Sequence, residues 1–299
     1  MNVTVSGASG FIGRKLLPLL EARGHAVHIL GRKPKAGLPA SVRFSLWEPD
    51  QGQPPVESLA SADAVIHLAG EPVAQRWSPE VKRRIRASRS VGTRNLVNAI
   101  GALQQKPSIL ISASAVGYYG DRADETLTEK SKPGTGFLPE VCVEWETEAR
   151  AAERLGLRVA MPRIGIVLGR DGGALDKMLP PFQWGVGGRL GSGKQWMPWI
   201  HLDDLCDLFV WLLENDRARG PFNASAPNPV TNADFTRELG RALRRPAIFP
   251  VPRAAIRALY GEMADILFYS QRAVPAAAQA LGFEFRHPEI FASLKDLLS

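Results

Sequence analysis

The chain has 299 residues, of which 45% are hydrophobic and 22% are charged, and its formal net charge is +7. This is the composition of an ordinary globular protein, and the length allows one large α/β domain or a domain with a smaller companion. No stretch reaches the roughly 18 uninterrupted apolar residues of a membrane helix, and the N-terminus lacks the basic leader of a signal peptide, so no membrane partner is expected.

The first element in the chain is a strand that leads into a glycine-rich turn. Residues 3–13 read VTVSGASGFIG, and an apolar helix follows over residues 11–23. Glycine permits a sharp turn and a close approach of the backbone to a diphosphate, and the helix N-terminus directs N–H groups at that diphosphate. The order of strand, loop and helix therefore predicts a dinucleotide site that contains these residues: Gly7, Gly10, Phe11, Ile12 and Gly13.

The second strand, over residues 26–30, ends in Gly31, Arg32 and Lys33. In NAD-specific folds an acidic residue about twenty positions after the glycines binds the ribose 2′-hydroxyl. Here Arg32 takes that place, nineteen residues after Gly13. Two cations attract the 2′-phosphate of NADP(H), which is therefore the predicted cofactor. The alternative is that both side chains are surface charges after a strand.

Further strands are expected over residues 42–46, 64–68 and 109–113. The strand at 64–68 contains His67 and leads into Leu68, Ala69 and Gly70, which are small enough for a nucleotide to lie against their backbone. A lone histidine at the end of a buried strand is usually a hydrogen-bonded core residue, and we interpret His67 in that way.

A long helix is expected over residues 79–103, and it contains the basic run 82–86, with the sequence KRRIR. Such a run together with the net charge suggests a nucleic-acid binder. No aromatic interleaving or DNA-binding motif accompanies it, so a solvated helix face is favoured and no nucleic-acid partner is expected. The excess positive charge would also attract an anionic small-molecule substrate.

The strand at 109–113 is followed by the sequence SASAVGYYG over residues 112–120. Because ligands bind at the carboxyl ends of parallel strands, Ser114, Tyr118 and Tyr119 are expected to face the cleft. A serine hydroxyl can polarise a carbonyl group, and a tyrosine phenol can exchange a proton with it. The alternative is a polar turn with stacked aromatic rings.

The alternation of strands and helices continues with a helix over residues 137–155 and a strand over 158–161. It predicts a doubly wound, mostly parallel Rossmann-type sheet in residues 1–168, with a returning segment near 198–225. A strand over 196–201, a helix over 205–213 and a strand over 221–224 are expected there. Residues 169–197 and 226–299 are assigned to a smaller, discontinuous substrate lobe, with helices near 232–243, 253–268 and 288–298.

Several motifs occur in one order along the chain: GASGFIG, HLAG, SASAVGYYG, MPRIGIVLG at 161–169 and WIHLDD at 199–204. This series resembles the extended short-chain dehydrogenase/reductase superfamily. More narrowly, GEP at 70–72, RW at 76–77, SR at 88–89 and GSG at 191–193 resemble its atypical epimerase-family branch. The resemblance implies an NADP(H)-dependent oxidoreductase or epimerase-like enzyme that acts on an anionic carbonyl or sugar-nucleotide substrate in the cytoplasm, with a possible homodimer. It also implies cofactor contacts from Arg84, Arg89 and Pro162.

The chain departs from the superfamily at its acid–base pair, which is a tyrosine four residues before a lysine. The four tyrosines are followed at that spacing by Arg122, Ala123, Ala264 and Ala273. In one interpretation, Tyr118 or Tyr119 supplies the proton, Ser114 orients the carbonyl and a nearby arginine replaces the lysine. In the other, the protein is a non-catalytic regulator that binds NADPH without turnover.

Two loops each pair a cation with an aromatic ring, which suits an anionic, ring-bearing substrate. They contain Arg76 with Trp77 and Lys194 with Trp196. The second loop also satisfies the G-x-x-x-x-G-K pattern, but Gln195 follows where Ser or Thr must hold Mg²⁺, so no ATP site is expected. Cys142 and Cys206 are far apart without metal-ligand partners, which indicates a reducing compartment and no metal.

Overall fold

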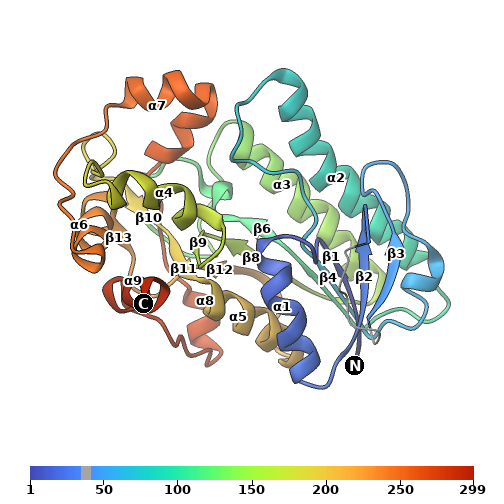
Figure 1. Ribbon diagram of the computed structural model, residues 1–299. Helices are drawn as coiled ribbons and strands as arrows, with labels where there is room; N and C mark the ends of the chain where they lie inside the picture. Colours follow the sequence, from blue (N-terminus) through green and yellow to red (C-terminus); the bar gives the residue numbers. More distant parts are fainter. Residues whose placement is uncertain (35–41) are drawn as a thin grey trace.

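A single parallel sheet runs through the protein in the computed structural model, which describes residues 1–34 and 42–299 (Figure 1). Its strands lie in the order β3, β2, β1, β4, β5, β8, β12, with the short strand β6 beside β8. Every pairing in it is parallel. The strands are β1 Asn2–Ser6, β2 Ala26–Gly31, β3 Arg43–Leu46, β4 Ala64–His67, β5 Ile109–Ser112, β6 Ser114–Ala115, β8 Arg158–Ile164 and β12 Gly220–Ala224. The order reverses between β1 and β4, which confirms the predicted doubly wound fold and leaves a crevice at the carboxyl ends of these strands.

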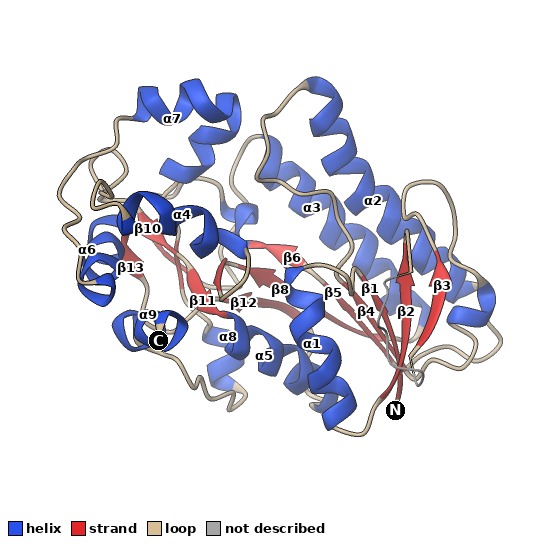
Figure 2. Ribbon diagram, in the orientation of Figure 1, coloured by secondary structure: helices blue, strands red, loops and turns tan. Residues whose placement is uncertain are grey.

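Helices cover both faces of the sheet (Figure 2). Helices α1 (Phe11–Ala22) and α5 (Leu202–Glu214) pack against each other on one face, and α2 (Pro79–Gly101) and α3 (Phe137–Arg150) on the other. The four strands β1, β2, β4 and β5 are almost completely buried, and the helices bury one stripe each. This burial of apolar area supplies most of the driving force for folding.

Helix α2 illustrates how local sequence sets an element. Its N-cap Ser78 accepts a hydrogen bond from the backbone N–H of Val81, and Pro79 occupies the first turn, where its missing N–H costs nothing. The apolar stripe expected for this helix is buried: Val81, Ile85, Gly92, Leu96 and Ile100. Its second half packs with strand residues, and its first half packs with α3. The prediction of a long helix here is confirmed, ending at Gly101.

Three expected elements are interrupted. The helix expected over 137–155 is α3 followed by a 3-10 segment, η3 (Ala151–Leu155), and the helix expected over 253–268 is α7 (Arg253–Tyr260) followed by η4 (Gly261–Phe268). The strand expected over 196–201 is split at Pro198 into β10 (Trp196–Met197) and β11 (Trp199–His201). Proline lacks the N–H that a continuous ladder requires. Strand β10 pairs antiparallel with β13 (Val230–Thr231), and β11 pairs parallel with β9 (Ile166–Leu168).

A second group of elements lies beyond the β12 end of the sheet, away from β3 (Figure 1). Its helices are α4 (Gly173–Gln183), α6 (Asn232–Leu243), α7, α8 (Ala276–Ala280) and α9 (Ile290–Leu298), and β7 (Thr126–Leu127) pairs with β14 (Arg272–Ala273). Helices α4, α6 and α9 share an apolar core with Trp199. Helix α4, which contains Pro180 and Pro181, was not among the expected elements. The division of the chain into two domains stays a prediction.

In the part of the chain that the structure describes, no helix combines the length and apolarity needed to cross a membrane.

One buried carboxylate fastens the C-terminal region to the sheet domain. Asp204, in the first turn of α5, is fully buried, and its oxygens accept the backbone N–H groups of Arg286 (2.9 Å) and His287 (3.0 Å). Burial raises the pKa of Asp204, and these two hydrogen bonds act in the opposite direction. The segment before α9 is therefore held by the sheet domain through its backbone, in addition to the ion pair of the Arg286 side chain with Asp207 and the stacking of His287 on His201.

We expect Asp204→Ala to lower the free energy of unfolding by about 3 kcal/mol, because two buried N–H groups lose a charged acceptor. Asp204→Asn keeps one acceptor oxygen, so its free energy of unfolding should lie between that of Asp204→Ala and that of the natural protein. The measurement is urea unfolding, with limited proteolysis of the C-terminal segment. As a matched control, Asp207→Ala removes only an ion pair to the Arg286 side chain and should cost less than about 1 kcal/mol. Equal stability of the two alanine variants would contradict the role of Asp204.

Candidate functional site

The carboxyl ends of β1, β2, β3 and β4 surround an open cavity of about 320 Å³. It lies at the point where the strand order reverses, which is where open parallel sheets bind ligands. Residues predicted to contact the cofactor line much of this cavity: Gly7, Gly10, Gly31, Arg32, Leu68, Ala69, Gly70 and Arg84. The glycine turn, the end of β2 and the end of β4 are thus brought together as the sequence indicates. We refer to this space as the nucleotide cavity.

The glycine turn contributes Gly7, Ser9 and Gly10 to the nucleotide cavity, so two of these three lining residues present only backbone. Gly7 has a φ of +72°, and a Cβ atom there would lie 2.6 Å from the carbonyl carbon of Leu68. Any side chain would therefore collide with the end of β4. Gly13 does not line the cavity, because it packs behind the turn, where a Cβ would lie 2.5 Å from the Cα of Ala8. Helix α1 begins after Gly10, which has no side chain to cap it and lines the nucleotide cavity, so the N-terminus of the helix is placed to receive an anion.

Arg32 borders the nucleotide cavity directly after β2, and it forms no ion pair with any residue in the described ranges. Its charge is therefore available to a ligand phosphate. Lys33 is exposed and does not line the cavity. Of the two cations predicted to bind the 2′-phosphate, Arg32 lines the nucleotide cavity and Lys33 does not.

The third strand contributes a wall of the nucleotide cavity that sequence reasoning missed. Trp47 follows β3, donates its indole N–H to the carbonyl of Gly52 at 2.8 Å, and lies beside the residues that complete this wall: Glu48, Pro49 and Asp50. Glu71, Pro72 and Ser88 line the opposite side. The rule that ligands lie at carboxyl ends of strands applies to β3 as it does to β1, and it could have identified Trp47.

Several predicted cofactor residues have other contacts and do not line the nucleotide cavity. The ring of Phe11 packs against the backbone of Gly169 and Gly173, Ile12 packs against the core, and Pro162 is buried in β8 beside Phe222. Their assignment to the cofactor stays a prediction.

Arg89 also lies behind the nucleotide cavity rather than in it. Its guanidinium is buried, donates to the carbonyl of Glu71 at 2.9 Å, and would be 3.2 Å from a Cβ on Gly70. Arg89 therefore supports the backbone at Gly70 and Glu71, which corrects its assignment as a direct contact. Arg84 does line the nucleotide cavity, but its guanidinium donates a hydrogen bond to the carboxylate of Glu80 at 2.8 Å.

The basic run on α2 is largely neutralised within the chain. Lys82 pairs with Glu262, Arg84 with Glu80, and Arg86 with Glu140 and Glu144. These cations hold neighbouring elements to α2, and this arrangement agrees with a solvated helix face. The absence of a nucleic-acid partner stays a prediction.

A buried ion pair occupies the region where the superfamily's tyrosine and lysine are expected. Glu146, on α3, accepts two hydrogen bonds from Arg163 on β8, at 2.7 and 2.8 Å. Ser114 donates its hydroxyl to the same carboxylate at 2.8 Å. Burial alone would lower the pKa of Arg163, but its hydrogen bonds and the charge of Glu146 outweigh that effect and raise it. We refer to Ser114, Glu146, Arg163 and the two tyrosines beside them as the Arg163 network.

The two tyrosines differ sharply in their surroundings. Tyr119 is fully buried, and its hydroxyl accepts from Arg163 at 2.9 Å and lies 2.6 Å from the amide oxygen of Asn223. Burial raises the pKa of Tyr119 to about 12. Tyr119 is therefore unavailable as a proton donor to a ligand, which corrects the expectation stated for it. Tyr118 is only partly buried, and the guanidinium of Arg163 lies 3.5 Å from the centre of its ring.

The hydrogen bond from Ser114 to Glu146 also changes the expected role of that serine. A carboxylate only accepts hydrogen bonds, so the single hydroxyl proton of Ser114 is committed to Glu146. The remaining lone pairs of Ser114 can accept a hydrogen bond but leave no proton for a substrate carbonyl. In this arrangement Ser114 suits an alcohol or an amide N–H rather than a carbonyl oxygen.

The sequence did contain a signal for this ion pair. Glu146 interrupts the inner face of α3 one turn after Cys142, and Arg163 interrupts an otherwise apolar strand. A single buried charge is very costly, so two opposite charges on apolar faces indicate a buried pair.

The four residues predicted to bind substrate make structural contacts in most cases. Arg76 donates to the carbonyl of Ala258, at the end of α7, at 3.1 Å, and Trp77 packs edge-on against Phe137 with ring centres 5.2 Å apart. Trp196 donates to Asp124 at 3.0 Å, and Lys194 is exposed. None of the four lines the nucleotide cavity, and their contact with a substrate stays a prediction.

His67 is a core residue, as the sequence indicated. Its Nδ1 atom lies 2.6 Å from the hydroxyl of Ser6, and its side chain is fully buried. Burial, with a smaller effect from Arg89, lowers the pKa of His67 to about 4. The ring is therefore neutral at pH 7.

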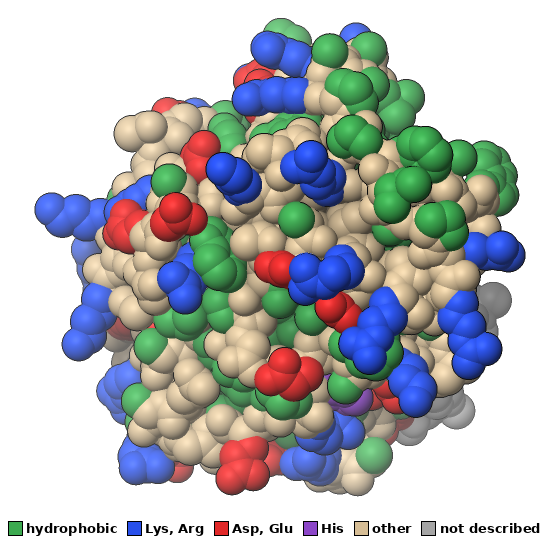
Figure 3. All heavy atoms as spheres, turned by 90° about the vertical axis from the view of Figure 1, so that its left-hand side faces the viewer, with side chains coloured by type: hydrophobic (Ala, Val, Ile, Leu, Met, Phe, Trp, Pro, Cys, Tyr) green, Lys and Arg blue, Asp and Glu red, His purple; other side chains and the backbone are tan. Residues whose placement is uncertain are grey.

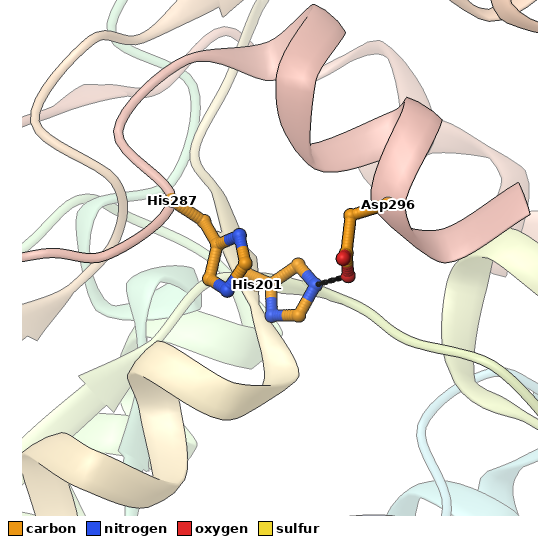
Figure 4. Close-up of side chains that lie close together, drawn as sticks. All are labelled: His201, His287 and Asp296. Atoms are coloured by element: carbon orange, nitrogen blue, oxygen red, sulfur yellow. Dashed lines mark ion pairs between the residues drawn. The ribbon is translucent and has the colours of Figure 1, made fainter. Parts of the chain in front are cut away.

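Three potential metal ligands lie together among the described residues, away from the nucleotide cavity (Figure 4): His201, His287 and Asp296. The two imidazole rings are stacked, with centres 3.8 Å apart and planes inclined by 16°. Nδ1 of His201 accepts the N–H of Asp203 at 3.1 Å, which leaves the ring proton on Nε2, 3.4 Å from Asp296. Stacked rings direct their lone pairs side by side rather than to one point. The geometry suits a structural contact that holds α9 to β11, through His201 and Asp296, better than it suits a metal site.

The Arg163 network generates a stability prediction. Arg163→Met leaves the Glu146 carboxylate buried without its partner, so we expect a loss of about 3–5 kcal/mol in the free energy of unfolding. The double variant Arg163→Met with Glu146→Leu should lose less free energy of unfolding than the sum of the losses in the two single variants. Urea unfolding measures both. Arg94→Met, which removes an exposed ion pair to Glu148, is the control and should cost less than about 1 kcal/mol. Additive losses in the double variant would show that the pair is not coupled.

Comparison with known proteins places this geometry in a family. Residues 3–225 match the model of the NAD dependent epimerase/dehydratase family, and residues 251–297 match a domain of unknown function, DUF1731. The epimerase family protein SDR39U1 homolog of Arabidopsis thaliana, described as chloroplastic, is 41% identical over 100% of this chain and 87% of its own length.

Solved structures give the same result. The human epimerase family protein SDR39U1, crystallised with NADPH, has a TM-score of 0.89 and 35% identity, over 100% of this chain and 99% of its own. The nucleoside-diphosphate sugar epimerase of Corynebacterium glutamicum has a TM-score of 0.82 and 36% identity, over 100% of this chain and 58% of its own. The chain belongs to the NAD dependent epimerase/dehydratase family.

Proposed function

We propose that this protein is an NADP(H)-dependent oxidoreductase or epimerase-like enzyme that acts on an anionic carbonyl, alcohol or sugar-nucleotide substrate. The observation that carries the proposal is the position of Arg32 on the nucleotide cavity, without an ion-pair partner among residues 1–34 and 42–299, where NAD-specific folds have a carboxylate. The human relative crystallised with NADPH supports the same cofactor.

The residues around the nucleotide cavity fit a dinucleotide. Backbone at Gly7 and Gly10, together with the N-terminus of α1, would hold the diphosphate, because a Cβ at Gly7 would fill the space beside Leu68. Arg32 would hold the 2′-phosphate. The bound cofactor supplies hydride transfer at its nicotinamide ring.

Within the Arg163 network, Tyr118 is the tyrosine whose ring remains partly accessible. The guanidinium of Arg163 lies over the ring of Tyr118, where its positive charge would stabilise a phenolate. We propose that Arg163 replaces in this way the lysine that the resemblance to the superfamily implies. Ser114 would accept a hydrogen bond from a substrate hydroxyl. Tyr118 is therefore the proposed proton donor and acceptor, and Ser114 the group that orients the substrate.

A second candidate function is supported by the same network. The hydroxyls of Ser114 and Tyr119 are both committed within the protein, to Glu146 and to Asn223. A non-catalytic protein that binds NADPH and signals its presence would need no free acid–base groups. Measurements of binding and of turnover separate the two functions.

Arg32→Glu should weaken NADPH binding at least tenfold, because a charged hydrogen bond to the 2′-phosphate is lost and a like charge is introduced. NADH lacks that phosphate, so its dissociation constant should change far less. The measurement is a pair of titrations by calorimetry. Lys33→Glu makes the same charge change at the neighbouring residue outside the cavity and is the matched control. Equal weakening of NADPH and NADH by Arg32→Glu would contradict the assignment.

NADPH carrying deuterium at C4 of the nicotinamide tests turnover. Incubation with the protein and a metabolite extract should transfer the label to a metabolite, identified by mass spectrometry. Tyr118→Phe should lower the rate by about 10²–10⁴-fold, because it removes the general acid, while the dissociation constant of NADPH stays within a few-fold. Label that remains on bound NADPH throughout would reject the enzyme and favour the regulatory protein.

A further inference from the structure

A second cavity, of about 220 Å³, lies on α6, far from the nucleotide cavity. The two cavities have no lining residue in common, and α6 lies at the opposite end of the molecule from β2 and β3 (Figure 1). The residues that line it come from α6, from the segment after α6 and from the loop before β10: Arg189, Ala233, Thr236, Arg237, Gly240, Arg241, Arg245, Ala247 and Ile248. We refer to this space as the arginine cavity.

Small residues create the recess. Positions 233, 237 and 240 lie on one face of α6, since they repeat at helical spacing. Gly240 brings the following segment close, because a Cβ there would lie 2.8 Å from the Cβ of Ala247. The segment turns back at Arg244, whose φ of +54° is left-handed, and the N–H of Arg245 bonds to the carbonyl of Gly240 at 2.9 Å. This turn places the side chain of Arg245 beside α6.

The arginine cavity carries an excess of positive charge. Four arginines and no acidic side chain line it. Arg237 is paired with Asp234 at 3.0 Å and with Glu238 at 3.1 Å, and Arg241 lies 3.5 Å from Glu238. Arg189 and Arg245 have no carboxylate within ion-pair distance anywhere in the described part of the chain. Two carboxylates against four guanidiniums leave two positive charges for a ligand.

Space-filling atoms show the surface on the side of α6 (Figure 3). Basic side chains are more widespread on it than acidic ones, with apolar side chains between them. A scattered set of solvated arginines would have the same excess charge but no recess. Here the excess occurs at a cavity whose walls include the apolar side chains of Ala247 and Ile248.

The geometry points to a binding site for a small phosphate-bearing ligand, with a phosphate monoester as the chemical class. A phosphate monoester carries about two negative charges at neutral pH, which match Arg189 and Arg245, the two guanidiniums of this cavity without a carboxylate partner among the described residues. Arg189 also donates a hydrogen bond to the carbonyl of Ser192. The guanidinium fork suits phosphate oxygens in a bidentate arrangement. At about 220 Å³ the recess suits a small ligand better than one of the size that cavities of roughly 300–1,000 Å³ enclose. The apolar wall at Ile248 accommodates a short organic substituent.

Such a ligand would join two parts of the chain. Arg189 belongs to the loop that pairs with Val251 through two backbone hydrogen bonds, and Ala233 donates its N–H to the carbonyl of Gly193 at 2.8 Å. The ligand would therefore bridge this loop and α6, next to the strand pair β10 and β13.

The test is isothermal titration calorimetry with phenyl phosphate at constant ionic strength in a phosphate-free buffer. We expect saturable 1:1 binding to the full-length protein. Arg245→Gln and Arg189→Gln should each weaken it about tenfold, the loss of one charged hydrogen bond, and the double variant should abolish it. Phenol as the probe should give no binding, because it lacks the phosphate.

Two controls distinguish other sources of binding. Arg217→Gln removes an exposed arginine elsewhere and should leave the affinity unchanged. Saturation with NADPH occupies the nucleotide cavity, which also attracts phosphate, and should leave the affinity for phenyl phosphate unchanged as well. Loss of binding in the presence of NADPH, with retention in the double variant without NADPH, would place the phosphate in the nucleotide cavity and overturn the proposal. Absence of saturable binding, or weakening by all three substitutions alike, would also overturn it.

Discussion

The buried ion pair between Arg163 and Glu146 determines how the centre of this molecule is built. Arg163 belongs to β8 and Glu146 to α3, so the pair fixes a helix to the sheet at the point where β6 and β12 also meet β8. Two charges removed from water are stable only when each satisfies the other and the remaining polar atoms find partners. Ser114 supplies one such partner and Tyr119 another. The hydroxyl groups of Ser114 and Tyr119 are therefore engaged by the buried pair and its surroundings.

The nucleotide cavity and this ion pair are built from different parts of the fold. The cavity depends on backbone shape at Gly7 and on the ends of β1, β2 and β4, none of which involves α3. The ion pair, by contrast, joins Glu146 of α3 to Arg163 of β8. The contacts that shape the nucleotide cavity are therefore distinct from those that hold α3 on the sheet.

The sequence predicted best those features that local interactions determine. The parallel sheet, the glycine turn and the position of Arg32 follow from periodicity, from turn chemistry and from distance along the chain. Other features depend on residues that are distant in sequence, and these were missed or misassigned. The burial of Tyr119 is set by Asn223 and Arg163, and Arg89 supports Gly70 because α2 lies beside the end of β4. Helix α4 forms despite Pro180 and Pro181, because its apolar side chains pack against α6 and Trp199. In each case, tertiary packing outweighed the local signal.

The loop after β4 connects the two ends of the molecule. At its start, Glu71 and Pro72 line the nucleotide cavity, and the backbone of Glu71 is held by Ser88 and Arg89. A few residues later Arg76 donates to carbonyls at the end of α7, and Lys177 of α4 donates to the carbonyl of Ala74. A single short loop thus contacts the cofactor side with its first residues and the C-terminal helices with its last. The wall of the nucleotide cavity and helices α4 and α7 are therefore connected through one loop, although neither helix lines that cavity.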